Sequence, residues 1–552
     1  MPEFDRYGDN PMMTEPCVLP ADLSTDLDAF ERDVAAFTTG SLSPADFKPK
    51  HVPWGIYEQR RDGAFMVRTR IPGGQLPASQ ARAMALLGRD HGGILHLTTR
   101  ENLQFHDVAI AQIPTLMRAL QSAGVSCKFG GGNTPRNVVA CPHAGVCPHE
   151  VFDVSPFIHA VTDHLLKLPA SPLLPRKFKA AFSGCPADCA LAMVTDIGLI
   201  ATVRHGKAGF SVYGGGGMGG APRIADHLAD WISADDAVRA FEALRRIFDR
   251  LGDRTNRARA RLRFVAAKLG AKEFATLFKS ELEAVIRDGI PACPAGVTVN
   301  SAPLNQSPPE SRRDASGMTV FDQRQPGLVS VLLQPPLGLL GWQTLLGLAD
   351  LTERYSAESA LHLTPRQEVL IRSVRETDLM EVSTAVNALG TSLDGGRAWG
   401  RIVACTGAAT CRLGIVDSRI LARALSEALD QAGIPTEILK AFDIRINGCP
   451  NCCGWHPVGD IGLSGALQKH DGQTVPSYRV HLGARRGEGQ TRFGTMMKIL
   501  PSDAVPGYVV SVIQDYASNR TKGQSFADYF DSDGFRRSSP AQEVRTVSGS
   551  QI

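Results

Sequence analysis

Cysteine is the residue type whose spacing in this sequence points most directly to chemistry. The chain has 552 residues and twelve cysteines. Eight of them form motifs with five or three residues between the two cysteines: Cys141 and Cys147, Cys185 and Cys189, Cys405 and Cys411, and Cys449 and Cys453. Thiolates grouped in this way bind zinc or an iron–sulfur cluster. Because no secretory signal is recognisable, we expect ligand or redox chemistry in a reducing compartment rather than disulfide bonds.

The order and spacing of these motifs repeat along the chain. Each of the four motif cysteines in the first half of the chain, Cys141, Cys147, Cys185 and Cys189, has a counterpart 264 residues further on. The flanking residues agree as well, since GCPADC (184–189) matches GCPNCC (448–453). DIGL recurs at the same offset, and LHLTTRE (95–101) resembles LHLTPRQ (361–367) at an offset of 266. Chance is a poor explanation for so many coincidences, so we infer an internal duplication.

The residues beside the cysteines bear on which metal they hold. Pro450 follows Cys449 and Gly454 follows Cys453, and such residues let backbone N–H groups turn toward sulfur and stabilise a charged cluster. The spacing therefore favours an iron–sulfur cluster over zinc, although it leaves both open. We expect the remaining polar side chains of these regions to pack or to form ordinary hydrogen bonds, namely Cys452, His143, His149 and His456.

Hydrophobic periodicity predicts the same order of elements in each copy: a strand, a helix, a strand pair around a TTR or TPR turn, and a second helix. The first copy has a strand at 65–71 and helices at 78–90 and 111–123, and the second has a strand at 328–333 and helices at 339–354 and 376–389. In the cysteine regions we expect strands at 178–183, 197–203, 209–213, 441–446 and 478–483, and helices at 235–252, 258–269, 272–287 and 503–516. This mixture favours α+β sandwiches over a doubly wound sheet.

Charge and hydropathy exclude several classes of function. The chain has 59 Lys and Arg against 56 Asp and Glu, a net charge of +3, whereas a dedicated nucleic-acid or membrane-surface binder carries a large basic excess. No apolar stretch reaches the roughly 18–20 residues of a membrane span. We therefore expect a cytoplasmic protein without nucleic-acid or membrane partners.

The cysteine motifs belong to a longer resemblance. ACTGAATC (404–411) followed by NGCPNCCG (447–454) resembles the cluster signature of the sirohaem-containing nitrite and sulfite reductases. Five other segments resemble that family in the same order: FMVRTRIPGG (65–74), HLTTRENLQFH (96–106), PRNVVAC (135–141), LPRKFKAAFSGC (174–185) and YGGGGMGGAPR (213–223). The resemblance spans about 60–515 and implies an α+β fold, the internally duplicated, pseudo-twofold nitrite/sulfite reductase fold.

In that fold, ferredoxin-like half-domains alternate with α+β domains that hold the sirohaem and the [4Fe–4S] cluster. The resulting expectation is an N-terminal extension (1–55), a first half-domain (56–127), a first sirohaem/Fe–S-type domain (128–290), a linker rich in Pro, Ser and Asn (291–325), a second half-domain (326–392), a second [4Fe–4S]/sirohaem domain (393–530) and a disordered tail (531–552).

The resemblance also implies roles for individual residues. The [4Fe–4S] ligands would be Cys405, Cys411, Cys449 and Cys453, and the Cys453 thiolate would also bridge to the sirohaem iron. The cations on the substrate side would be Arg68, Arg136, Lys177 and Lys179. The residues that hold the sirohaem carboxylates or line its site would be Arg100, Gln104, His106 and Asn451. Arg70 lies two positions from Arg68 in a strand and is expected to be structural.

The first copy departs from many relatives because it also carries four cysteines at ligand spacing. We expect Cys141, Cys147, Cys185 and Cys189 to hold a second cluster, the alternative being free packed thiols. A second sirohaem is not expected. The positions 264 residues after Arg136, Lys177 and Lys179 are Gly400, Ala441 and Asp443, so the second copy lacks the corresponding cations.

The function implied is the six-electron reduction of sulfite to sulfide, with nitrite reduction to ammonia as the alternative on the same centre. Lys179 in the RKFK motif favours sulfite, because plant-type nitrite enzymes tend to have Asn there. Two readings from other classes are a non-catalytic zinc or Fe–S protein and a tetrapyrrole-pathway oxygenase. No flavin or nicotinamide domain is visible, so the expected electron donor is a partner protein, either ferredoxin or a flavoprotein.

Overall fold

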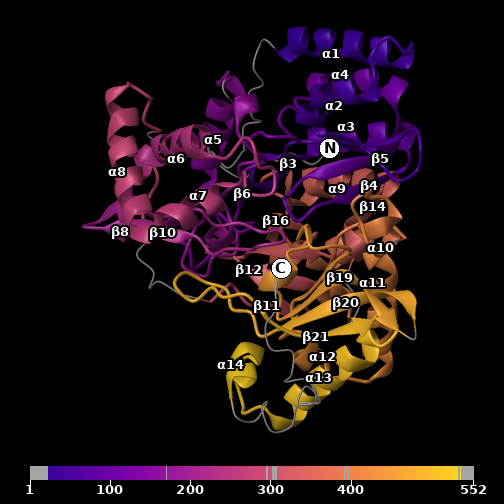
Figure 1. Ribbon diagram of the computed structural model, residues 1–552. Coiled ribbons are helices and arrows are strands. Elements are labelled where there is room, and N and C mark those ends of the chain that lie inside the picture. Colours follow the sequence, from indigo (N-terminus) through magenta and orange to yellow (C-terminus); the bar gives the residue numbers. More distant parts are fainter. Residues whose placement is uncertain are drawn as a thin grey trace. The chain divides into compact units, whose positions relative to one another are not determined.

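The structure is a computed structural model that describes residues 23–169, 171–293, 296–300, 307–390, 393, 398–470, 472–532 and 535. These residues fall into two compact units: unit 1 within Met1–Gly217 and Arg223–Asp394, and unit 2 within Met218–Pro222 and Gly395–Ile552. Unit 1 contains both predicted half-domains and the first cysteine quartet, and unit 2 contains the second quartet (Figure 1). Within the described ranges, no helix is long and apolar enough to cross a membrane.

The two half-domains each form an antiparallel sheet and exchange one short strand. The first sheet has the order β1 (Ile56–Glu58), β2 (Ala64–Arg68), β5 (Leu103–Ala109), β4 (Ile94–Leu97) and β14 (Leu339–Gly341). The second has the order β11 (Ser311–Arg313), β12 (Thr319–Asp322), β13 (Leu328–Leu333), β16 (Val369–Arg375), β15 (Ala360–Leu363) and β3 (Gln75–Pro77). Strand β14 therefore comes from the second half-domain and pairs with β4 of the first, whereas β3 of the first pairs with β15 of the second.

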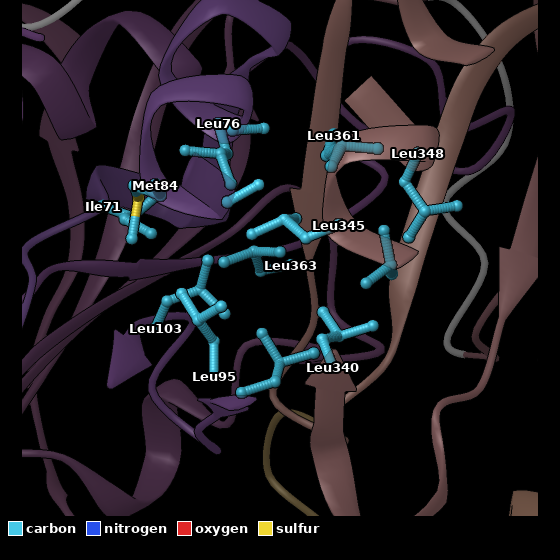
Figure 2. Close-up of a cluster of buried hydrophobic side chains, with 14 of the residues drawn as sticks. Ile71, Leu76, Met84, Leu95, Leu103, Leu340, Leu345, Leu348, Leu361 and Leu363 are labelled. Carbon is cyan, nitrogen blue, oxygen red and sulfur yellow. The ribbon is translucent and has the colours of Figure 1, made fainter. Parts of the chain in front are cut away.

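One hydrophobic core serves both half-domains. Figure 2 shows leucines of the first half-domain, such as Leu95 and Leu103, in one cluster with Leu340, Leu345 and Leu363 of the second, and all five are buried. Full burial of such a side chain contributes about 1.5–3 kcal/mol. Helices α3 (Ala78–Asp90) and α9 (Trp342–Tyr355) pack against each other, and α4 (Ile113–Ser122) and α10 (Leu379–Ala388) complete the two half-domains. The strand exchange and the shared core together join the halves into one body.

The N-terminal extension contributes to this core. Helices α1 (Leu23–Thr38) and α2 (Pro44–His51) bury Phe30 and Phe47 in the same hydrophobic cluster. The Phe47 ring also stacks on Phe37, with 4.4 Å between the ring centroids. The described part of the extension is therefore a structural element of the first half-domain.

The two cysteine-bearing domains contain five-stranded sheets with the same strand order. In unit 1 the order is β6 (Val139–Ala140), β7 (Ala180–Ser183), β8 (Ile197–Arg204), β9 (Lys207–Gly214) and β10 (Asp226–Ser233). In unit 2 it is β17 (Ile402–Ala404), β18 (Ile444–Asn447), β19 (Ile461–His470), β20 (Gln473–Leu482) and β21 (Thr495–Pro501). The first two pairings of each sheet are parallel and the others antiparallel.

Helices accompany each of these sheets (Figure 1). Those of the unit 1 domain are α5 (Ser155–Lys167), α6 (Ala237–Leu251), α7 (Leu262–Leu269) and α8 (Ala271–Arg287). Those of unit 2 are α11 (Ser418–Gln431), α12 (Thr436–Leu439), α13 (Val505–Asn519) and α14 (Phe526–Asp531). Aromatic side chains fill the unit 1 core, where the Phe210 ring makes edge contacts with Phe152, Phe157 and Phe182.

Several expectations from the sequence differ from the structure. The helix expected at 258–269 is α7, which begins at Leu262. The helix expected at 339–354 begins only at Trp342, because 339–341 form the exchanged strand β14. The predicted linker 291–325 is wrong in its last part, since β11 and β12 lie there and Val320 is fully buried. In the tail predicted to be disordered, Phe535 is buried against Tyr529 and Phe530, while 533–534 and 536–552 lie outside the described residues.

Gly74 allows a test of the shared core. Its φ is +70°, and a Cβ added there would lie 2.3 Å from the Leu363 carbonyl oxygen of the other half-domain. Gly63 has the same conformation (φ +71°) with nothing within 4 Å of the added Cβ. We expect Gly63→Ala to cost about 1 kcal/mol of unfolding free energy and Gly74→Ala a further 1–3 kcal/mol, roughly, from overpacking. The denaturation midpoints of the two variants, measured at the same iron content, give the difference in their unfolding free energies. Equal midpoints would contradict the close packing of Gly74 against Leu363.

Candidate active site

The four second-copy cysteines of unit 2 converge at the ends of two parallel strands. Cys405 directly follows β17, and Cys449 follows β18 after one glycine. Electrostatic interactions link Cys405 with Cys453, and Cys449 with both Cys453 and Cys411. Strands β17 and β18 are neighbours with Ala404 opposite Ile446, so their carboxyl ends lie side by side. The structure therefore brings together the four thiols that the sequence assigned to one cluster.

Backbone N–H groups surround these sulfurs. The Gly448 N–H donates to the Cys405 sulfur at 3.2 Å, and the Gly407 and Asn451 N–H groups bond to the sulfurs of Cys405 and Cys449. Burial and the neighbouring Cys453 raise the pKa of Cys405 to about 11, so thiolates here need a cationic partner, which the irons of a cluster supply.

The second-copy cysteines differ in their exposure and in their side-chain partners. The Asn451 side chain also bonds to the Cys449 sulfur, and Cys453 is exposed. Among the described residues, no group of three or more His, Cys, Asp or Glu side chains is arranged to hold a single metal ion.

In unit 1, two of the predicted substrate cations meet at one carbonyl group. Arg68 at the end of β2 and Arg136 both donate to the Gly130 carbonyl oxygen, at 3.1 and 2.6 Å. Arg136 also donates to the Gly132 carbonyl at 2.8 Å. Backbone carbonyl oxygens, which carry no net charge, thus help to orient both guanidinium groups.

Two further residues belong to the same charged group: Lys179, a predicted substrate cation, and Arg100, which was predicted to bind the sirohaem carboxylates. Burial and, to a smaller extent, the charge of Arg136 together lower the pKa of Arg100 to about 9. Burial also lowers the pKa of Lys179, together with the charges of Arg100 and Lys177. The nearby carboxylate of Asp196 is already paired with Arg261 at 2.7 Å. The cations that act on Arg100 and Lys179 thus outnumber the nearby carboxylates, which are Glu101 and Asp196.

Several donors of this group are buried and have no partner: Arg100 Nε and Nη1, and Arg136 Nε. Buried guanidinium donors are normally hydrogen-bonded, and their planar forks match carboxylates and oxyanions. The chemistry of these residues therefore fits an anionic cofactor that carries carboxylates, as well as an anionic substrate.

Gln104 and His106, predicted to bind the cofactor, lie beside Arg68. The Gln104 amide has the orientation in which its oxygen and its nitrogen both form hydrogen bonds. The oxygen then accepts from Arg68 Nε and Nη2 at 2.9 and 2.8 Å. The nitrogen lies 3.1 Å from His96 Nδ1 and 3.2 Å from His106 Nε2. In this structure Gln104 therefore orients Arg68.

Arg70 was predicted to be structural, and the structure confirms this. Its guanidinium donates to the backbone carbonyls of Lys128, Phe129, Pro135 and Arg136 at 2.9–3.2 Å. These four bonds hold the segment that presents Arg136. Arg70 thus positions one of the predicted substrate cations.

The other predicted packing residues also have conventional partners. His456 Nδ1 lies 3.1 Å from Asn447 Oδ1, and His149 Nδ1 lies 3.2 Å from the Ser307 carbonyl. The His143 ring packs edge-on against Phe321. Cys452 is buried, and its thiol donates to the carbonyls of Pro450 and Gly219.

Tyr57 belongs to this site and was missed from the sequence, where a lone tyrosine gives no spacing signal. Its hydroxyl accepts from the Gly132 N–H at 3.0 Å and lies 3.4 Å from Arg136 Nη2. The Arg68 guanidinium lies 5.6 Å from its ring centroid. Burial raises the pKa of Tyr57, but Arg136, Arg68 and the Gly132 N–H outweigh it and lower the pKa to about 7.

Comparison with known proteins shows the family to which this chain belongs. The model of the nitrite and sulphite reductase 4Fe-4S domain matches 131–286 and 395–535. That of the nitrite/sulfite reductase ferredoxin-like half domain matches 57–123 and 321–389. These matches cover most of the chain, which therefore belongs to the nitrite and sulfite reductase family.

Individual relatives support the same conclusion. The chain is 30% identical over 506 residues to the assimilatory ferredoxin-dependent nitrite reductase of Haloferax mediterranei, covering 87% of this chain and 84% of the relative. It is 28% identical to sulfite reductase [ferredoxin] 1 of Mycolicibacterium paratuberculosis, covering 89% of each chain. The solved structure of the Mycobacterium tuberculosis NirA protein superposes with a TM-score of 0.78 at 25% identity, covering 94% of this chain and 96% of that one.

The class of enzyme follows from these findings. The chain is an oxidoreductase that acts on sulfite or nitrite and has an iron–sulfur cofactor. The family resemblance and the duplicated α+β fold inferred from the motifs are confirmed. The non-catalytic reading has no support from these relatives.

Tyr57 predicts a pH dependence of anion binding. Because its hydroxyl ionises near pH 7 between Arg68 and Arg136, the tyrosinate formed above that pH removes positive charge from the site. We expect KM for nitrite, whose own charge is constant in this range, to rise about three- to tenfold between about pH 6 and 8.

Tyr57→Phe should flatten that profile. Tyr355→Phe, at the half-buried last residue of α9 in the second half-domain, should leave it as in the parent enzyme. Near-ultraviolet titration of the tyrosinate provides an independent readout. A Tyr57→Phe enzyme with the parent KM profile would contradict this role.

Proposed function

We propose that the chain reduces sulfite to sulfide with six electrons at a sirohaem that the Cys453 thiolate bridges to a [4Fe–4S] cluster. The ligands of that cluster would be Cys405, Cys411, Cys449 and Cys453. The convergence of these four thiols in unit 2 supports the cluster. The main support for the sirohaem is the set of buried donors without partners on Arg100 and Arg136 in unit 1.

Sirohaem suits these donors because it carries many carboxylates. Arg100 would bind them through its free Nε and Nη1, while Gln104 and His106 would line the site and hold Arg68 in place. Asn451 would keep the Cys449 sulfur hydrogen-bonded. When bound, the sirohaem with its cluster supplies an iron that accepts the anion and delivers electrons one at a time.

The cations would bind and activate the substrate. Arg68, Arg136, Lys177 and Lys179 would hold the sulfite oxygens and stabilise negative charge as each oxygen leaves. The lowered pKa of Lys179, which burial and the neighbouring charges of Arg100 and Lys177 cause, makes its ammonium group a stronger acid. Lys179 would therefore give protons to the departing oxygens, which leave as water.

The electrons would come from a partner protein. Several relatives are named ferredoxin-dependent sulfite or nitrite reductases, which supports ferredoxin as the donor over a flavoprotein. The same electron count converts nitrite to ammonia, and the Haloferax mediterranei relative is a nitrite reductase. Lys179 within RKFK favours sulfite as the better substrate.

The sirohaem assignment is tested by absorption and extraction. Enzyme purified anaerobically after expression with ample iron and tetrapyrrole should show the red absorption bands of sirohaem, and acid–acetone extraction should release the pigment. Colourless protein, or brown protein with cluster absorption alone, would refute the sirohaem.

The role of Lys179 is tested by removing its charge. Lys179→Met should lower kcat/KM for sulfite at least about 100-fold, since one preorganised charge at the reacting oxygens is lost, and should leave the red bands unchanged. Lys207→Met, at an exposed hairpin position, is the matched control. Unchanged turnover would exclude Lys179 from the reaction.

Substrate preference is tested by the same position. With chemically reduced viologen as donor, we expect kcat/KM for sulfite to exceed that for nitrite. Lys179→Asn should move this ratio toward nitrite, because a neutral amide suits an anion of lower charge. A parent enzyme that prefers nitrite would establish the alternative activity.

A further inference from the structure

The first-copy cysteines of unit 1 converge in the same way as the second set. Cys141 directly follows β6, and Cys185 follows β7 after one glycine. Cys141 hydrogen-bonds with Cys189, and Cys147 interacts with both Cys141 and Cys185. Four thiols from two loops thus meet at the carboxyl ends of two parallel strands, although the oxyanion chemistry described above uses none of them.

The backbone around this first-copy quartet reproduces that of the second copy. Ala140 lies opposite Phe182 in β6–β7, as Ala404 lies opposite Ile446 in β17–β18. Ala404 and Ile446 each lie 264 positions after their counterparts Ala140 and Phe182. The next pairing agrees as well, with Ala180 opposite Ile197 and Ile444 opposite Ile461.

The turns that follow also agree between the copies. Positive φ angles occur at corresponding positions, 52° at Asp188 and 57° at Cys452, then 57° at Leu191 and 64° at Trp455. A short 3-10 turn comes next in each copy, Ala192–Val194 and His456–Val458.

The hydrogen bonds to sulfur follow the same pattern. The His143 N–H bonds to the Cys141 sulfur, and the Ala187 N–H bonds to the Cys185 sulfur. In the second copy the corresponding donors are Gly407, for Cys405, and Asn451, for Cys449. Hydrogen bonds of this kind stabilise cluster sulfurs and tune their potential.

Different residues maintain this geometry in the first copy. The Asp188 carboxylate accepts from the Ser183 hydroxyl at 2.6 Å and from the N–H groups of Ala192 and Met193 at 2.7 and 3.1 Å. It thereby fixes the turn between Cys185 and Cys189. At the corresponding position of the second copy, Cys452 instead packs its thiol against carbonyl groups.

The second half-domain holds the other loop of the first-copy quartet. Arg372 of β16 donates to the carbonyls of Pro142 and Ala144 at 3.1 and 2.7 Å, and Glu358 binds its other side. The Arg324 N–H donates to Val146 and the Gln325 side chain to Gly145, at 2.9 and 3.1 Å. The loop from Cys141 to Cys147 is therefore fixed at four carbonyl groups, which preorganises its ligands.

We propose that Cys141, Cys147, Cys185 and Cys189 hold a second [4Fe–4S] cluster, one without an attached tetrapyrrole. The 4Fe-4S family model matches 131–286, which contains all four. A sirohaem has no cation set in the second copy, where Gly400, Ala441 and Asp443 stand at the relevant positions, and Asp443 is buried in ion pairs with Arg445 and Arg486. The inference rests on the cluster assignment in the second copy and is independent of the substrate.

The composition of the holoenzyme tests this proposal directly. Full-length protein, purified anaerobically after co-expression with iron–sulfur assembly proteins, should contain about eight acid-labile sulfides per chain rather than about four. After dithionite reduction, its EPR spectrum should include a simple reduced-cluster signal beside that of the sirohaem-coupled cluster. About four sulfides, or zinc in place of the additional iron, would overturn the second cluster.

Reciprocal variants separate this inference from the proposed function. Cys141→Ala/Cys185→Ala should lose about four sulfides and the simple EPR signal while keeping the red bands. Cys449→Ala should lose the red bands and still retain about four sulfides. Cys127→Ala, at a buried thiol outside both quartets, should match the parent.

These measurements decide between one cluster and two even if the Cys141→Ala/Cys185→Ala variant does not fold. A Cys449→Ala protein without sulfide would place every cluster in the second copy and overturn the inference, whatever the yield of the double variant. A parent enzyme with about eight sulfides but no red bands would refute the sirohaem and leave the second cluster supported.

Discussion

The parallel pairing of two short strands is the constraint on which both cysteine quartets depend. In each copy, the carboxyl ends of β6 and β7, or of β17 and β18, deliver the first cysteine of a motif to one place. A register slip of one residue would shift one end by about 3.3 Å and turn its side chains to the other face. The positive-φ turns, the N–H groups aimed at sulfur and the second cysteine of each motif are arranged relative to these strand ends. The pairing of a few strand residues is therefore enough to bring together cysteines that lie 44 positions apart in the chain.

Backbone carbonyl and side-chain amide oxygens orient several of the cations of unit 1. Arg68 and Arg136 bind backbone carbonyls and the Gln104 amide, and Arg70 binds four carbonyls. Counter-ions would fix these side chains equally well but would cancel the field that an anion needs. Partial charges on carbonyl oxygens orient a guanidinium and leave most of its charge available. The depressed pKa values of Arg100 and Lys179, to which burial contributes most and neighbouring cations add, are the electrostatic consequence.

Much of this could be predicted from sequence because duplication and periodicity are local signals. The 264-residue offset gave the repeat, and apolar periodicity gave the helix at 78–90 to the residue. The exchanged strand β14 could not be predicted, since three residues carry no period and their partner β4 lies far away in the chain. The place of Tyr57 beside Arg136, and the contact by which Gln104 orients Arg68, depend on long-range folding in the same way. The anchoring of the 141–147 loop by Arg372 likewise arises only from folding.

The exchange of β3 and β14 bears on how such a chain could arise. A single ancestral copy would present a sheet edge without the short strand that completes it, and an open edge of this kind recruits an identical strand from another molecule. Reciprocal exchange between two identical copies produces a closed, twofold-symmetric homodimer. Gene fusion of that dimer would convert a concentration-dependent association into a permanent one. Each half could then diverge, so that one has Arg136 and Lys179 where the other has Gly400 and Asp443, without any loss of assembly.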